Sequence, residues 1–171
     1  MRILTLITMV LTFLIGAPLT VATSFKLNDE MEKVEEAKIN IEKTLKTYED
    51  TANMNPEIEA LVKETQEKME EFPSTSMASI STILSYILGL LALVIVVFAF
   101  MKKELTQKMA FALIGLSVLF WIVTPSIEQG TYGGADPKKA AMIGAIFLIV
   151  CGISAYFSHV LYIKKQEKIA L

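Results

Sequence analysis

The chain alternates between long stretches without charge and one stretch that is dense in charge. The stretches without Asp, Glu, Lys or Arg are 3–25, 74–101, 109–127 and 140–163. An apolar helix of about 20 residues crosses the roughly 30 Å hydrocarbon core of a bilayer, because each residue rises about 1.5 Å. The last three stretches therefore predict an all-α integral membrane protein with three transmembrane helices. These helices are expected at about 78–101, 108–126 and 139–163.

The first uncharged stretch has two interpretations. Arg2 precedes an apolar run that reaches Gly16 and Pro18, where the helix is expected to break, and small residues follow up to Ala22. This layout favours a secretory signal peptide, 1–22, that is cleaved after Ala22. The alternative is an uncleaved signal anchor that adds a fourth membrane helix.

Lysines between the predicted spans indicate an orientation. Loop 102–108 and tail 164–171 each hold three lysines and one acid, whereas loop 128–139 holds two of each. Because basic loops stay in the cytoplasm, the first two are expected inside, and 128–139 and the segment 23–73 outside. Asp136 before a proline is typical of a helix N-cap. The predicted segments are 1–22, 23–73, 74–101, 102–108, 109–127, 128–139, 140–163 and 164–171.

The outward segment combines charge with a regular apolar stripe. Successive stripe positions are alternately four and three residues apart, which is the a/d spacing of a coiled coil with Lys38 as one polar a position. We expect two amphipathic helices, at about 28–53 with Asn28 as N-cap and at 56–72 beginning at Pro56. The candidate partner-binding stripe is Leu27, Met31, Val34, Lys38, Ile41, Leu45 and Tyr48.

Two roles remain open for this hairpin. It can be a charged spacer whose stripe closes on itself, or an interaction module that pairs with another protein. Residues 26–71 carry seven lysines and fourteen acids, a net charge of −7. Such a surface favours a basic extracytoplasmic partner.

Small residues recur at every fourth position in two of the predicted membrane helices. Ser81, Ser85 and Gly89 form one row, and Ala140 and Gly144 form another. Rows of this kind let helix backbones approach closely in a membrane. They are candidate helix-packing sites, either within the chain or against other subunits in a homo-oligomer or a larger complex.

The composition leaves few residues that could form a catalytic site. The chain has 171 residues, is 53% hydrophobic, has a net charge of −2, and contains one cysteine and one histidine. We therefore expect no nucleic-acid binding, no catalytic or metal site, no cofactor and no enzyme activity. A weaker alternative is a redox subunit in which His159 binds haem together with a ligand from another chain.

The expected function is that of a structural or accessory subunit of a multi-protein complex in a bacterial inner membrane. Its outward hairpin would dock other subunits or a basic protein, and the bilayer would hold its helices. The alternative from another class is a homo-oligomeric channel, transport or pilin-like secretion component.

Overall fold

The protein folds entirely into helices over the residues that its computed structural model describes, which are 1–52, 56–70, 72–127 and 136–170. Within these residues there are five helices and no strands. The helices are α1 (Arg2–Ala52), α2 (Pro56–Glu70), α3 (Thr75–Phe100), α4 (Leu105–Val123) and α5 (Pro137–Ala170).

Helix α1 is one continuous helix of 51 residues with Pro18 inside it. The expected break at Gly16 and Pro18 is therefore wrong, and so is the expected helix start at Asn28. Asn28 does not cap a helix; its side-chain Oδ1 accepts a hydrogen bond from the Thr82 hydroxyl at 3.0 Å. The apolar first stretch and the first outward helix form a single rod, which at about 1.5 Å per residue is about 75 Å long.

The local positions of Pro18 and Gly16 explain why the helix continues. Proline lacks an N–H and crowds the carbonyl four residues earlier, here that of Leu14. Pro18 and Leu14 both lie on the exposed face of α1, away from the packed interface. Gly16 is buried, and a Cβ there would lie 2.9 Å from the Cβ of Phe147 on α5. The glycine thus serves a close helix contact rather than a helix end.

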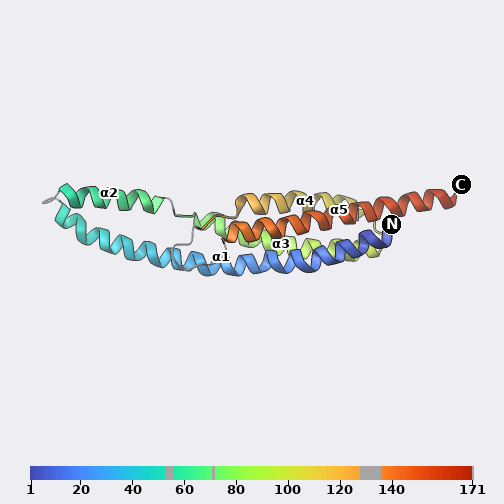
Figure 1. Cartoon of the computed structure of the whole chain (residues 1–171), viewed down its shortest axis with the longest axis horizontal. Coiled ribbons are helices and arrows are strands. Elements are labelled where there is room, and N and C mark those ends of the chain that lie inside the picture. Colours follow the sequence, from blue (N-terminus) through green and yellow to red (C-terminus); the bar gives the residue numbers. More distant parts are fainter. Residues whose placement is uncertain (53–55, 71, 128–135, 171) are drawn as a thin grey trace.

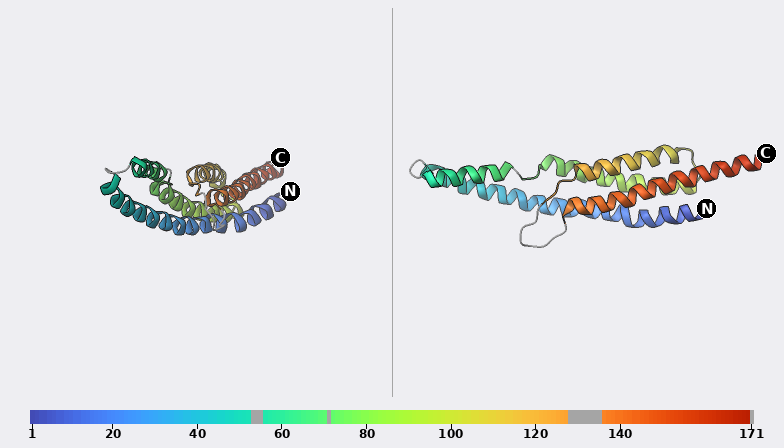
Figure 2. Two further views of the ribbon diagram at one scale, coloured as in Figure 1. Left: turned by 60° about the vertical axis from the view of Figure 1, so that its left-hand side comes forward. Right: turned by 45° about the horizontal axis from the view of Figure 1, so that its top comes forward.

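The helices form a bundle that extends into a hairpin (Figure 1). The first half of α1 packs against α3 and α5, which in turn pack against α4, and the second half of α1 continues beyond them and pairs with α2. Both chain termini and the α3–α4 turn lie at the opposite end from the hairpin, as the turned views also show (Figure 2). Two helices are present where the sequence predicts the hairpin, with α2 beginning at Pro56, but the first of them is the end of α1.

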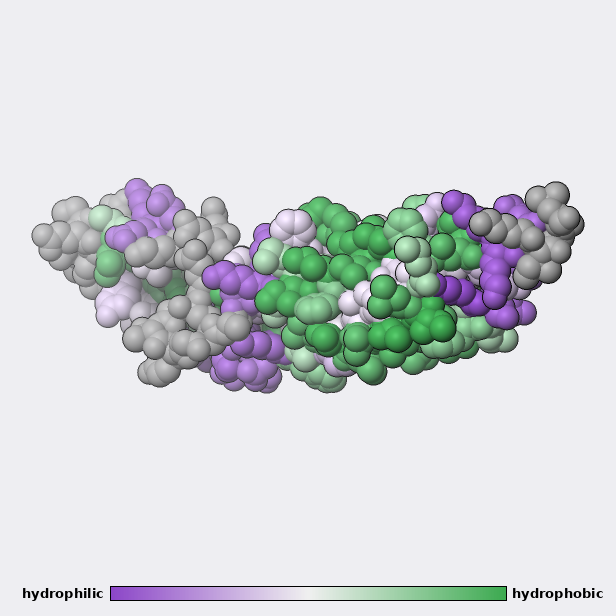
Figure 3. Space-filling model, turned by 45° about the vertical axis from the view of Figure 1, so that its right-hand side comes forward, coloured by the Kyte–Doolittle hydropathy of each residue, from purple (hydrophilic) through white to green (hydrophobic). Residues whose placement is uncertain are grey.

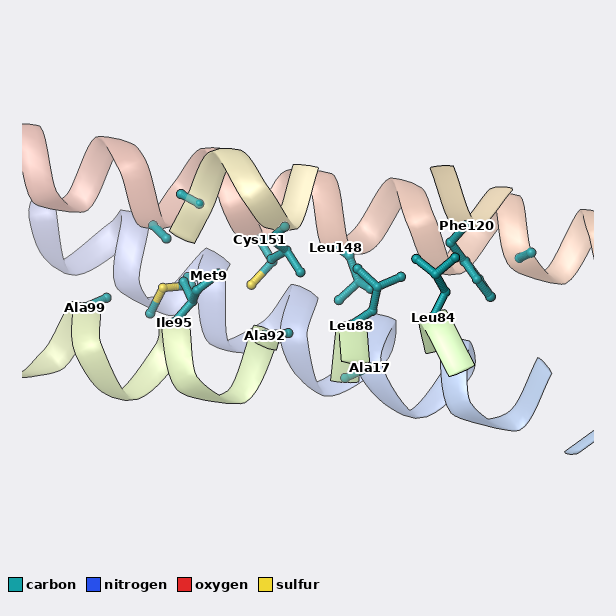
Figure 4. Packing of buried hydrophobic residues seen from close by; sticks show 14 residues of the cluster. Met9, Ala17, Leu84, Leu88, Ala92, Ile95, Ala99, Phe120, Leu148 and Cys151 are labelled. Carbon is teal, nitrogen blue, oxygen red and sulfur yellow. The ribbon is translucent and has the colours of Figure 1, made fainter. Parts of the chain in front are cut away.

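The core of the bundle is a narrow seam of small and medium side chains. Buried residues of α4 recur at alternating spacings of four and three, from Thr106 through Ala110, Leu113 and Ser117 to Phe120. Side chains from all four long helices meet there, with Met9 of α1 beside Ile95 of α3, and Leu148 of α5 beside Leu88 of α3 (Figure 4). This periodicity is that of nearly parallel helices packed along one face.

The outer surface of the bundle is apolar. Many large hydrophobic side chains are exposed, including Leu90 at 68% and Phe111 at 58%. They form a continuous apolar band between hydrophilic ends (Figure 3). Four helices (α1, α3, α4 and α5) are long and apolar enough to cross a membrane. The three expected spans are thus joined by a fourth candidate span near the N-terminus.

The ends of the spans differ slightly from the expected ones. Helices α3 and α4 begin and end within about three residues of the predicted limits, as is usual for helix boundaries. Helix α5 continues through the basic tail to Ala170, past the predicted limit at 163. Lys, Glu and Gln are good helix formers, so the tail extends the helix after its apolar part has ended.

Candidate functional site

The first residues of the predicted coiled-coil stripe are buried at the joint between hairpin and bundle. Leu27 is fully buried and Met31 is 7% exposed, and both pack with Ala78 of α3 and with Ile127. Asp136 ties this region together, since its side chain accepts hydrogen bonds from Ser126 Oγ at 3.0 Å and from the Lys138 N–H at 3.0 Å. The second bond is the N-cap expected before Pro137. The other residues expected in this loop, 128–135, lie outside the described part of the chain.

The rest of the stripe turns toward α2. Val34, Lys38 and Ile41 are half-buried, Leu45 is buried, and Tyr48 is 46% exposed. The Lys38 Nζ lies 5.5 Å from the centre of the Phe72 ring, which follows α2. Lys38, the polar a position of the stripe, therefore makes a cation–π contact within the hairpin.

The stripe does not close completely, because a groove of about 260 Å³ remains between α1 and α2. Leu45 and Val62 are its buried residues, while Tyr48 and Leu61 are exposed at its edge, Leu61 at 58%. The groove is lined by Asn40, Ile41, Thr44, Leu45, Tyr48, Leu61, Val62 and Thr65.

The polar groups of the groove are largely used by the helices themselves. The Thr44 hydroxyl donates to the Asn40 carbonyl at 2.8 Å, and the Thr65 hydroxyl donates to the Leu61 carbonyl at 2.7 Å. What the groove offers is consequently apolar surface. Its volume is below the roughly 300–1,000 Å³ of small-molecule sites, so it suits protruding side chains better than a whole ligand.

Charge surrounds the base of the hairpin. The Lys33 Nζ lies 2.8 Å from Asp29 Oδ2 and 3.4 Å from Glu30 Oε1. The hydrogen bond to Asp29 raises the pKa of Lys33 above its ordinary value. Residues 26–71 contain twice as many acids as lysines, so at least half of the carboxylates cannot be neutralised by lysines of the segment.

The small residues of α3 lie at contacts with two neighbouring helices. Ser85 is fully buried and hydrogen-bonds through its hydroxyl with that of Ser24 on α1. Ser81 is also buried, and its Oγ lies 2.7 Å from the Oγ1 of Thr124 at the end of α4. A Cβ at Gly89 would lie 3.4 Å from the side chain of Val21, at ordinary van der Waals distance.

On α5, Ala140 is half-buried and Gly144 is buried against α1. A Cβ at Gly144 would lie 2.8 Å from Thr20 Oγ1, and one at Gly152 would lie 2.9 Å from Ile114 on α4. The sequence patterns predict a helix break at Gly16 and do not predict the helix contacts of Gly16, Thr20 or Gly152. Gly16 and Thr20 are four residues apart and so form a small-residue row on α1, but this row lies in the stretch whose layout favours a signal peptide.

The single cysteine and the single histidine are both buried in α5. Cys151 is free and fully buried, and His159 is 6% exposed. Within the described ranges, no three His, Cys, Asp or Glu side chains are grouped so that they could hold a metal ion. The features that the chain brings together are thus the hairpin groove and the close helix contacts.

No family model matches the chain, and neither a curated protein nor a solved structure shows significant similarity to it.

Proposed function

We propose that the protein is a non-enzymatic accessory subunit of a bacterial inner-membrane complex. Four helices span the bilayer, the apolar part of α1 is retained as the first of them, and the hairpin of α1 and α2 docks a partner outside the cytoplasm. The observation that carries this proposal is the open apolar groove on the acidic hairpin.

The arrangement of the chain ends supports a four-span topology. With four spans, both termini lie on one side, and the α3–α4 turn must lie there too. These three features are at one end of the bundle, and the hairpin is at the other (Figure 1). The basic residues of 102–108 and 164–171 therefore share an end with Arg2, in agreement with the positive-inside rule.

Contacts of the first 22 residues support retention of the N-terminal segment. Met9 is fully buried in the core, and Gly16 and Thr20 lie against α5 at distances that leave no room for further atoms. Cleavage after Ala22 would remove these side chains and expose the facing surfaces of α3 and α5. Removing packed residues from a core costs several kcal/mol even for single side chains, typically about 2–5 kcal/mol for a leucine or methionine.

Charge and size define the partner. A second copy of the hairpin would bring another net charge of −7 toward the first, so self-association through this surface is disfavoured. A basic amphipathic helix offers the opposite charge together with apolar side chains for the groove, which is a common mode of helix recognition. We therefore assign the groove to a basic helix of another subunit.

A pair of photocrosslinking sites tests this assignment in intact cells. A photoreactive amino acid at Tyr48 is at the edge of the groove, and one at Ile39 is equally exposed, at 46%, but outside the groove lining. We expect crosslinks to a different protein with a basic helix from position 48 but not from 39. The yield of crosslinked product should fall as ionic strength rises, because salt screens the attraction between the acidic hairpin and the basic helix.

Substitutions give a matched control. Leu61→Ser changes an exposed residue of the groove, and Ile39→Ser makes the same kind of change outside it. Loss of the crosslink in the first variant alone supports docking at the groove. Crosslinks only between copies of this chain would contradict it and favour the homo-oligomeric channel, and a symmetric ring with ion conductance would establish that alternative.

A further inference from the structure

Three separate parts of the chain meet at the end of the bundle that holds both termini. They are Arg2 at the start of α1, Lys102 in the turn between α3 and α4, and Tyr162 on α5. Arg2 and Lys102 directly border uncharged stretches of the chain, and Tyr162 is the second-last residue of the uncharged stretch 140–163. The hydrophobic band of the bundle gives way to a hydrophilic end (Figure 3).

The two cations converge on one aromatic ring. The Arg2 Cζ is 4.9 Å and the Lys102 Nζ is 5.2 Å from the centre of the Tyr162 ring. Each cation is attracted by the ring face. Both positive charges thus lie near the same ring, and an anion that contacts both would balance them.

The backbone at Lys102 is unusual for a residue with a side chain. Its φ is 60°, in the left-handed region. The Lys103 N–H donates to the Phe98 carbonyl at 3.1 Å, which is the long bond of a Schellman motif at the end of α3. Glycine is the usual residue at the left-handed position, because a Cβ is crowded there. The lysine therefore holds a position that α3 alone would give to glycine.

The hydrogen-bonding capacity of this cluster is not used up within the described part of the chain. Arg2 donates one long hydrogen bond, from Nη2 to the Ala99 carbonyl at 3.4 Å. Its Nε is buried with no partner among the described residues. The salt bridges of those residues include neither Arg2 nor Lys102. A guanidinium with unused donors and an ammonium group that contact the same ring fit the oxygens of a phosphate group.

We propose that Arg2, Lys102 and Tyr162 form a binding site for a phosphate group, which either the headgroup of an anionic phospholipid or free phosphate can supply. The inference rests on the proposal that the chain spans a bilayer with α1 retained, and it does not depend on docking at the hairpin. The bound phosphate would join α1, the α3–α4 turn and α5 at the membrane surface.

The test uses the full chain, purified in mild detergent, with binding followed by native mass spectrometry. The probes are phosphatidylglycerol, the zwitterionic phosphatidylcholine, and inorganic phosphate. We expect phosphatidylglycerol to bind more tightly than phosphatidylcholine. Lys102→Gly removes one cation and suits the left-handed backbone, so it should fold and should bind phosphatidylglycerol about fivefold more weakly.

Lys103→Gln is the matched control, because it removes one charge from the same turn without a contact to Tyr162. We expect less than a twofold change in this variant. Displacement of the lipid by millimolar inorganic phosphate, with the same loss in Lys102→Gly, would keep the site and assign free phosphate to it. Equal weakening in both variants, or none in Lys102→Gly, would overturn the site. Either result leaves docking at the hairpin to its own test with Leu61→Ser.

Discussion

The bundle and the hairpin bury their surfaces to very different extents. In the bundle, backbones approach so closely that a Cβ at Gly144 would lie 2.8 Å from Thr20 Oγ1. Hydroxyls join neighbouring helices directly, as between Ser81 and Thr124 at 2.7 Å. In the hairpin, a groove of about 260 Å³ stays open, and Leu61 at its edge is 58% exposed.

The proposed topology, with the bundle in lipid and the hairpin in water, gives the difference a physical meaning. Lipid is as apolar as the helix surfaces, so helices associate in a membrane through close packing and hydrogen bonds. The bundle contacts meet that requirement within one chain. Outside the membrane, water drives apolar surface together. An open apolar groove on a water-facing hairpin is therefore surface that another helix can cover, while the bundle interior is already filled.

The largest effect should come from the filled core. Leu88→Ala removes a fully buried side chain of α3 and should cost about 2–5 kcal/mol. Leu90→Ala changes a residue of the same helix that is 68% exposed, and should cost about 0.5 kcal/mol or less. Reversible unfolding in detergent micelles measures both. Similar costs for the two variants would contradict the packing of α3.

A bulkier residue at a close contact should have the next largest effect. A Cβ at Gly16 would lie 3.2 Å from the backbone nitrogen of Leu148, so Gly16→Leu must push α1 away from α5 and should cost about 1–3 kcal/mol. A Cβ at Gly115 meets nothing within 4 Å, so Gly115→Leu should be nearly neutral in the same unfolding assay. If the first 22 residues are absent from the mature protein, Gly16→Leu will leave its stability unchanged.

A smaller effect is expected from the hydroxyl pair of Ser81 and Thr124. Hydrogen bonds between membrane helices contribute about 0.6 kcal/mol on average and at most about 1.7 kcal/mol. A double-mutant cycle with Ser81→Ala and Thr124→Ala isolates the coupling between the two side chains. Strict additivity of the two single effects would show that the 2.7 Å contact does not hold α3 to α4.

An effect of comparable size, up to about 1 kcal/mol, is expected in the hairpin. Lys38→Gln removes the cation over the Phe72 ring, 5.5 Å away, which should cost about 0.5–1 kcal/mol. Amide hydrogen exchange of α2 in the full chain should then become faster. Lys46→Gln, at an exposed position of α1, is the control. Equal exchange in both variants would mean that Lys38 does not hold α2 in place.

Sequence patterns predict the helices of this fold better than they predict the contacts between those helices. Charge-free length identifies three of the four candidate spans, and Pro56 marks the start of α2, because both depend on local chemistry. The break expected at Gly16 and Pro18 is wrong. The helix-breaking tendency of glycine and proline is a local property, whereas the contact of Gly16 with α5 and the outward position of Pro18 depend on how the helices pack.

The groove and the phosphate cluster lie beyond the reach of sequence patterns for the same reason. The heptad spacing indicates which residues share one face of α1, but not how far α2 covers that face. Arg2 and Tyr162 are 160 positions apart in the chain, and no spacing indicates that both lie beside Lys102. These arrangements depend on the packing of whole helices.

The mass of the intact mature protein, purified from its membrane, tests most directly whether α1 completes the bundle. With α1 retained, the mass should be close to the 19.0 kDa of the whole chain, and peptides from the first 22 residues should be recovered with it. A mature chain that begins at Thr23 would contradict a bundle that includes Met9, Gly16 and Thr20, and would remove Arg2 from the proposed phosphate site.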